Sequence, residues 1–298
     1  MEALVLGFSD YAEQGRRLAE ALSLPYAETA LHRFPDEESL VRLPTELPPH
    51  LIVCRSLDRP NDKLIELMLT ARTARSLGVR RLTLVAPYLC YMRQDAAMHP
   101  GESVSQRIVG QLLAELFDDL VTVDPHLHRV AKLRQAVPLG TAACLHAAEP
   151  IGEFVAAELD HPLVLAPDQE AEQWVKLIAA PRGLDYATAT KQRRGDRDVS
   201  IDLPSIPVTG RSVLVVDDVA SSGGTLAVVA RELEAAGAAE INVVLTHALF
   251  AQGAMDAIRQ TPIRNIWSTD SIRHDSNTIE LGTLLAEAVQ RLRGSASR

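Results

Sequence analysis

The sequence predicts an α/β protein with two similar domains, each containing a mainly parallel sheet flanked by helices. Short apolar runs rich in β-branched residues alternate with helical periodicity along nearly the whole chain. The length of 298 residues fits two domains of ordinary size. A stretch punctuated by Gly and Pro, residues 138–150, separates two halves with the same strand–helix–strand rhythm. We therefore expect domains at residues 1–145 and 146–298.

The strands are predicted from apolar runs bounded by polar or turn-forming residues. Eight such runs stand out, at residues 4–7, 51–54, 82–86, 120–123, 163–166, 213–216, 241–245 and 263–267. All are far shorter than the roughly 20 apolar residues that a membrane helix requires. We therefore expect no membrane span.

The helix between the second and third predicted strands has the clearest pattern. Apolar residues within 64–71 follow the spacing i, i+3, i+4, i+7. Asn61 and Asp62 are suited to the N-cap, and Gly78 is suited to the turn that ends the helix.

Composition excludes several classes of protein. Hydrophobic residues make up 47% of the chain and charged residues 23%, which is typical of a folded globular protein and not of a disordered one. Acidic residues outnumber basic ones by 39 to 30, and no basic stripe is interleaved with aromatics, so we expect no nucleic-acid partner. The three cysteines are widely spaced, and the first residues lack a signal-peptide pattern. A cytoplasmic location is therefore expected.

The strongest chemical signal is a loop that follows the run at 213–216. Asp217 and Asp218 end the strand, and a loop of small residues precedes a helix that extends to about residue 237. The loop consists of Ser221, Ser222, Gly223, Gly224 and Thr225. Backbone N–H groups at the start of a helix favour a phosphate, and carboxylates accept hydrogen bonds from ribose hydroxyls. A phosphosugar site is predicted here; the alternative is a solvated turn with Asp as a helix cap.

This loop resembles the phosphoribosyl diphosphate loop of type I phosphoribosyltransferases. Four further motifs occur in order, at residues 34–38, 55–62, 87–95 and 123–126. Together the five motifs resemble the ribose-phosphate diphosphokinases, also called phosphoribosyl diphosphate synthetases, over about residues 4–290. The resemblance implies two phosphoribosyltransferase-like (Rossmann-like) domains, with ribose 5-phosphate in the carboxyl-terminal one and ATP bound with the help of the amino-terminal one.

The resemblance implies a reaction and its substrates. The diphosphoryl group of MgATP would pass to the C1 hydroxyl of ribose 5-phosphate, giving phosphoribosyl diphosphate and AMP. The implied ATP-binding residues of the chain's own site are Arg93, Gln94 and Asp95. Those that would reach the adenine of a neighbouring subunit are Phe34, Asp36 and Glu38. We therefore expect a homo-oligomer, a dimer or larger.

The resemblance also implies the catalytic and metal-binding residues. Lys191 and Arg193 match a catalytic Lys-x-Arg, in a stretch that otherwise reads as an exposed loop. His126 matches a histidine near the ATP phosphates and the metal, and Asp168 matches an acid that touches the sugar and Mg²⁺. The simpler alternative for each of these residues is a solvated or structural side chain.

The chain departs from the family pattern at two places. Glu37 stands where the family usually has glycine, which predicts a stiffer loop. Glu170 and Glu172 follow Asp168 where glycines are common. These carboxylates either cap the next helix or weaken anion binding, and we expect Glu172 near the mouth of the site.

Two other functions share part of this pattern. A phosphoribosyltransferase would use the loop at 221–225 but has no need of the motifs at 34–38 and 93–95. A non-catalytic, synthetase-like regulatory subunit would keep the fold and lose the cationic residues. The presence of Lys191 and Arg193 favours the enzyme.

Overall fold

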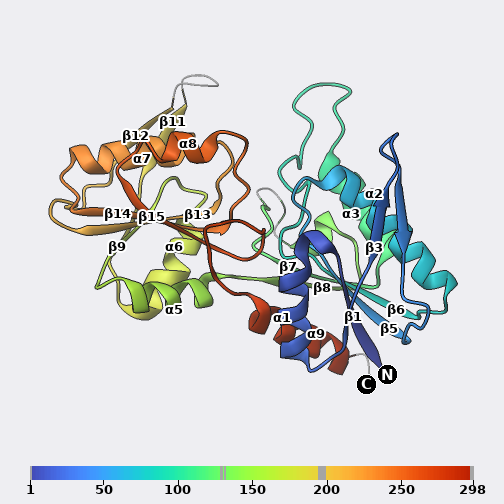
Figure 1. Ribbon diagram of the computed structural model, residues 1–298. Coiled ribbons are helices and arrows are strands. Elements are labelled where there is room, and N and C mark those ends of the chain that lie inside the picture. Colours follow the sequence, from blue (N-terminus) through green and yellow to red (C-terminus); the bar gives the residue numbers. More distant parts are fainter. Residues whose placement is uncertain (1, 128–129, 131, 194–198, 296–298) are drawn as a thin grey trace. The chain divides into compact units, whose positions relative to one another are not determined.

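The protein, a computed structural model, is described at residues 2–127, 130, 132–193 and 199–295 (Figure 1). It divides into two compact units, Met1–Leu145 with Gly282–Arg298 and His146–Leu281. Each unit contains a six-stranded parallel sheet. The predicted α/β class with two similar domains is therefore confirmed. Within the described residues, no helix is long and apolar enough to cross a bilayer.

The sheet of the first unit is parallel throughout. Its strands are, in spatial order, β2 (Tyr26–Glu28), β1 (Ala3–Gly7), β5 (His50–Cys54), β6 (Arg81–Val85), β7 (Asp119–Val123) and β8 (Thr141–Leu145). Every residue of β1 and β7 is buried. Such strands are mostly apolar because helices cover both faces of the sheet.

The helices of the first unit cover both faces of its sheet. They are α1 (Ala12–Leu22), α2 (Pro60–Ser76), α3 (Ser105–Leu116), α4 (Leu133–Ala136) and α9 (Gly282–Ser295), with a 3₁₀ turn at Ser9–Tyr11. Alternate strand residues such as Leu4 and Leu6 share a core with Leu67 of α2 and Leu113 of α3. On the other face, α1 packs beside α9 (Figure 1).

The last helix belongs to the first unit. It contacts α1, β7 and β8, and Arg81 donates a hydrogen bond to the carbonyl of Leu292 at 3.0 Å. This differs from the predicted extent of the second domain, 146–298. The apolar stripe of a helix shows that it needs a partner surface, but not which of two similar sheets provides it.

The second unit repeats the arrangement of the first. Its parallel sheet has the order β10 (Tyr186–Thr188), β9 (Leu163–Ala166), β13 (Ser212–Val219), β14 (Glu240–His247), β15 (Ile263–Thr269) and β16 (Asn277–Ile279). Its helices are α5 (Ala148–Glu158), α6 (Glu172–Ala179), α7 (Gly224–Ala235) and α8 (Ala254–Ile258), with a 3₁₀ turn at Ala180–Arg182. Residues of α7 and α8 share one core with β9, β13 and β14, while α5 packs beside α6.

A two-stranded antiparallel hairpin follows the first edge strand in each unit. In the first unit β3 (Ala30–Arg33) pairs with β4 (Ser39–Arg42). In the second, β11 (Thr190–Arg193) pairs with β12 (Val199–Asp202). The sequence motifs at 34–38 and 191–193 therefore lie on hairpins at equivalent places in the two units.

All eight predicted strands are present, as β1, β5, β6, β7, β9, β13, β14 and β15. The predicted helix is α2, but it begins at Pro60 after Arg59, so Asn61 and Asp62 lie in its first turn and not at the cap. Proline is favoured at this position because the first helical N–H has no partner within the helix.

Candidate active site

The phosphate loop joins β13 to α7. Strand β13 continues through Asp217 and Asp218, and α7 begins at Gly224. The N–H of Gly224 is 3.4 Å from Oγ of Ser222, and the N–H of Ala227 donates to the carbonyl of Gly223. The loop thus has the strand–turn–helix form that directs backbone N–H groups toward an anion.

Gly223 is required by both backbone and packing. Its φ is +73°, a left-handed conformation that residues with a Cβ adopt at a cost. A Cβ at this position would lie 2.7 Å from Cδ1 of Ile258 in α8. The loop therefore rests on α8, and the N–H of Ala251 reinforces it by donating to the carbonyl of Ser221 at 2.8 Å.

Three carboxylates lie near one another at the ends of β9 and β13, those of Asp168, Asp217 and Asp218. Burial raises the pKa of Asp217 well above its usual value, and the nearby carboxylates of Asp218 and Asp168 raise it further. The backbone N–H of Asp218 donates to Asp217 at 3.0 Å and partly offsets this rise in pKa. Like charges in a buried place disfavour ionisation, whereas a bound cation would favour it. The donor set therefore suits a hard divalent cation.

Asp168 organises the start of α6. Its Oδ1 accepts hydrogen bonds from the backbone N–H groups of Glu170 at 3.1 Å and Ala171 at 3.3 Å. Glu172 is in the first turn of α6 and forms an ion pair with Lys176 at 2.6 Å. This ion pair lies on the surface of α6. The expected position of Glu172 at the mouth of the site stays a prediction.

Lys191 and Arg193 lie on β11. Their backbones pair with Ile201 and Val199 of β12, so this stretch is an antiparallel strand and not the loop that its charge predicted. The side chains of these two residues and all of Arg194 lie outside the described part of the structure. Their catalytic role stays a prediction.

The predicted residues of the chain's own ATP site lie in the first unit. Arg93 and Gln94 are exposed, while Asp95 is buried. Oε1 of Gln94 accepts a hydrogen bond from Ser105 at 2.6 Å, which joins this segment to α3. His126 is half-buried in the segment after β7. His126 belongs to the first unit and Asp168 to the second.

The hairpin tip displays the residues predicted to reach a neighbour's adenine. Phe34 is 40% exposed, its ring 4.8 Å from that of His32 in an edge contact. Backbone hydrogen bonds from Phe34 to Glu38 and from Glu37 to Phe34 close the tip. Glu37 has a φ of +71°, a conformation that favours glycine and explains the usual family residue there. Asp36 accepts a bond from the N–H of Glu38 at 3.4 Å.

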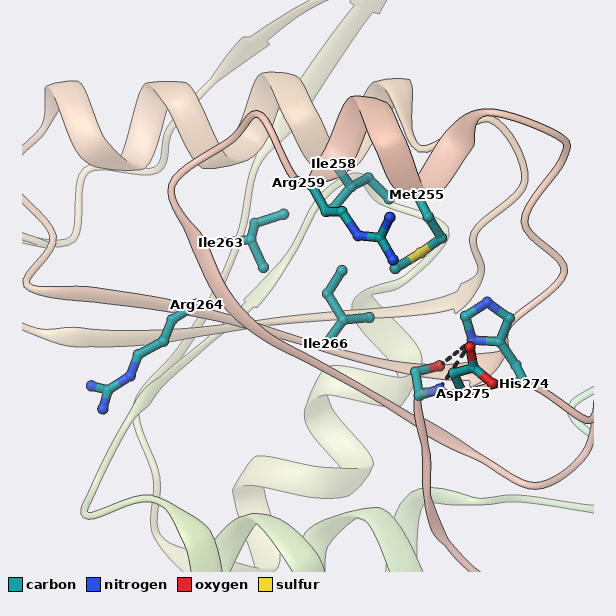
Figure 2. Close-up of a pocket in the computed structure, with 9 residues that line it drawn as sticks. Met255, Ile258, Arg259, Ile263, Arg264, Ile266, His274 and Asp275 are labelled. Carbon is teal, nitrogen blue, oxygen red and sulfur yellow. Dashed lines mark hydrogen bonds between the residues drawn. The ribbon is translucent and has the colours of Figure 1, made fainter.

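A pocket of about 290 Å³ lies beside α8 (Figure 2). It is lined by Met255, Ile258, Arg259, Ile263, Arg264, Ile266, His274, Asp275 and Ser276. In Figure 2, Arg259 reaches toward Met255, whereas Arg264 points away. Burial lowers the pKa of His274, and its Nδ1 accepts the N–H of Ser276 at 3.1 Å. Ile258 belongs to both the pocket and the loop support, which no sequence motif indicated.

Comparison with known proteins identifies the family. The chain matches the N-terminal domain of ribose phosphate pyrophosphokinase at residues 4–116 and a phosphoribosyl transferase domain at residues 142–280. It is 34% identical over 295 residues to the ribose-phosphate pyrophosphokinase of Methanopyrus kandleri, covering 98% of this chain and 100% of the relative. The chain belongs to the ribose-phosphate pyrophosphokinase family.

A further relative and a solved structure support the same family assignment. The enzyme of Saccharolobus solfataricus is 30% identical over 281 residues, covering 93% of this chain and 95% of the relative. The crystal structure of phosphoribosylpyrophosphate synthetase from Mycobacterium smegmatis has the same fold, with a TM-score of 0.83 at 19% identity over 99% of this chain and 100% of that one. The ribose-phosphate diphosphokinase activity predicted from the sequence is confirmed.

Proposed function

We propose that this pyrophosphokinase transfers the diphosphoryl group of MgATP to ribose 5-phosphate through the β13–α7 site. The observation that carries the assignment is the coupled carboxylate group of Asp168, Asp217 and Asp218 beside a loop shaped for phosphate. The 5-phosphate of the sugar binds the backbone N–H groups and hydroxyls of residues 221–225. Asp217 and Asp218 accept hydrogen bonds from the ribose hydroxyls.

The carboxylates also fit Mg²⁺. Oxygen ligands suit this hard cation, which commonly takes one or two protein carboxylates and fills its shell with water and substrate oxygens. Among the described residues, no three His, Cys, Asp or Glu side chains are grouped to hold a metal by themselves. We assign Asp168 and His126 as its protein ligands. When bound, the cation supplies positive charge next to the diphosphate oxygens.

The chemical step is a displacement at phosphorus. The C1 oxygen of the ribose forms a bond to the β-phosphorus, and the bond from that phosphorus to the oxygen bridging the α- and β-phosphates breaks. AMP leaves with the bridging oxygen, and the C1 hydroxyl loses its proton. Lys191 and Arg193 stabilise the charge that gathers on the β- and γ-phosphate oxygens and exclude water, while both substrates are held in register.

ATP is held by two segments of the first unit. Arg93, Gln94 and Asp95 bind the nucleotide of the chain's own site, with His126 near its phosphates. The hairpin tip at 34–38 completes the adenine site of a neighbouring subunit, with Phe34 stacking and the acids accepting from the exocyclic amine. The active form is therefore a homo-oligomer, a dimer or larger, and it works in the cytoplasm.

The reaction is tested by ³¹P NMR of purified protein with MgATP and ribose 5-phosphate. We expect AMP and a sugar diphosphate linked at C1 to appear together and in equal amounts. ADP together with a sugar that has gained a single phosphoryl group at C1 would contradict diphosphoryl transfer. Light scattering on the active sample tests the oligomer, and a fully active monomer would rule out the shared adenine site.

A further inference from the structure

The first turn of α2 contacts residues that closely precede both segments assigned to ATP. The hydroxyl of Tyr91 donates a hydrogen bond to Oδ1 of Asn61 at 2.5 Å. The adjacent residue, Asp62, forms an ion pair with Arg33, which precedes Phe34 at the hairpin tip. One helical turn is thus tied to the segment 91–95 by one residue and to the hairpin by the next.

Tyr91 is held in an unfavourable backbone conformation. Its φ is +61°, in the left-handed region that few residues with a bulky side chain adopt. Such a conformation persists only where surrounding contacts fix it. Because Tyr91 is 37% exposed, core packing does not enclose its ring, and the hydrogen bond to Asn61 is a specific restraint on its position. The backbone of residues 92–95 continues directly from this restrained residue.

Both strands of the hairpin are attached to the same helix. Arg33 at the end of β3 pairs with Asp62, and Ser39 at the start of β4 donates a hydrogen bond from Oγ to Glu66 at 3.1 Å. Asp62 and Glu66 are four residues apart and therefore lie on one face of α2. The two contacts flank the tip, so they fix the direction in which Phe34 is presented.

The turn itself has little freedom. Pro60 occupies the first helical position, and Arg59 before it has a φ of +48°. Nζ of Lys63, one residue beyond Asp62, lies 2.7 Å from Asp58 and 2.9 Å from the carbonyl of Ser56. These contacts hold the connection between β5 and α2 against the first turn of α2. A rigid turn is a suitable anchor for two segments that must be held for a ligand.

We propose that Asn61 and Asp62 are positioning residues for ATP, acting through Tyr91 and Arg33 respectively. The proposal rests on the assignment of residues 34–38 and 93–95 to ATP in the proposed function. Neither residue touches the nucleotide in this account. Loss of either contact loosens a nucleotide-binding segment and leaves the β13–α7 site of the second unit intact.

The test of the Asn61 contact is a double-mutant cycle with Asn61→Ala and Tyr91→Phe. Each single change should raise KM for ATP by about 5-fold, with kcat and KM for ribose 5-phosphate within about twofold of the parent. The double variant should be no worse than either single one, because both remove the same bond. Strictly additive effects, or unchanged KM for ATP, would overturn the role of Asn61.

The Asp62 contact is tested with Arg33→Met and the conservative Arg33→Lys, with ATP affinity measured by calorimetry as well as by KM. Arg33→Met should weaken ATP binding by about 5-fold and Arg33→Lys should recover most of it, because the charge opposite Asp62 is kept. Glu28→Gln, which breaks the exposed Arg16–Glu28 pair between α1 and β2, is the matched control and should leave ATP affinity unchanged.

These experiments separate the inference from the proposed function. Production of AMP by the parent enzyme tests the reaction, whereas the variants test only what positions the nucleotide. An active parent whose Arg33→Met and Glu28→Gln variants bind ATP equally well would overturn the role of Asp62 and leave the reaction standing.

Discussion

The β5–α2 turn of the first unit and the β13–α7 turn of the second unit occupy the same place in two sheets of identical strand order. In the first unit, this place holds a buried cation. Arg55 is 4% exposed, contacts Asp10 at 3.2 Å and Glu66 at 2.6 Å, and stacks on Phe8 at 4.1 Å from the ring centre. In the second unit, the same place holds Asp217 and Asp218, coupled to Asp168.

The backbones of the two turns also differ, and the difference parallels the one in charge. Pro60 opens α2 and contributes no N–H, whereas α7 opens at Gly224, which keeps its backbone N–H. The first turn therefore satisfies its charges with residues of its own chain. The second turn places Asp217 and Asp218 next to each other, and burial together with the nearby carboxylates raises the pKa of Asp217. The two turns therefore differ in charge complementarity within the chain, as expected if the first is structural and the second is the proposed ligand-binding turn.

The largest effect is expected from Asp217→Asn. Turnover should fall by about 10³-fold, because the amide keeps the shape but cannot supply the negative charge that accepts hydrogen bonds from the ribose hydroxyls. The unligated variant should be more stable than the parent. Since the folded-state pKa of Asp217 is raised, this carboxylate costs stability at neutral pH, and that cost shrinks as pH falls through the raised pKa.

Denaturant unfolding as a function of pH checks the stability part of this prediction. The parent should gain stability relative to Asp217→Asn as the pH is lowered. A variant that is less stable than the parent at neutral pH would show that Asp217 is satisfied within the folded chain.

Arg55→Met should act on stability in the first unit. Removing the guanidinium leaves Asp10 and Glu66 without their shared partner, and loss of one member of a buried ion pair costs about 3–5 kcal/mol. The control, Arg16→Met, removes an exposed pair and should cost less than about 1 kcal/mol. Urea unfolding of both variants measures the difference, and equal losses would mean that burial of Arg55 contributes nothing.

Lys191→Ala tests the hairpin of the second unit. If Lys191 stabilises charge that develops in the transition state, kcat should fall by about 10²-fold while binding of ribose 5-phosphate changes little. Stopped assays for AMP, combined with calorimetry of sugar binding, separate the two quantities. Turnover close to that of the parent would move the chemistry away from this strand.

Gly223→Ala and Gly224→Ala form a matched pair within the phosphate loop. At position 223 the new methyl meets Ile258 and an unfavourable φ, whereas at 224 the nearest atom, Oγ of Ser222, is 3.6 Å away. We expect Gly223→Ala to raise KM for ribose 5-phosphate by about 10-fold and Gly224→Ala to have a smaller effect. If the two variants have the same KM for ribose 5-phosphate, the contact of the loop with α8 does not contribute to sugar binding.

The sequence predicts the centre of each unit better than its edges. The run 163–166 is apolar throughout, and the run 82–86 is apolar except for Thr83, because helices cover both faces of the sheet. Both runs are therefore recognisable without knowledge of the fold. The edge strands β2 and β10 have three residues each and are partly exposed, so no periodic pattern marks them. The placement of α9 depends on which sheet it covers, which the sequence of a helix does not specify.

In the candidate site, too, some features are predictable from the sequence and others are not. The loop at 221–225 is recognisable because the residues that would bind phosphate are consecutive in the sequence. The network around Arg55 is not, because Asp10 and Glu66 reach it from 45 residues before and 11 residues after in the chain. Ile258 was missed for the same reason, since an isoleucine in α8 becomes a support for Gly223 only through tertiary packing.

The most direct test compares one acid from each unit that follows the first strand of its sheet, Asp10 after β1 and Asp168 after β9. Mn²⁺ is titrated into the protein with ribose 5-phosphate, and free Mn²⁺ is followed by its EPR signal, for the parent, Asp10→Asn and Asp168→Asn. We predict that Asp168→Asn weakens Mn²⁺ binding by about 10-fold or more and that Asp10→Asn leaves it unchanged. Equal weakening by both changes, or loss of Mn²⁺ affinity in Asp10→Asn alone, would contradict the assignment of the external cation to the second unit.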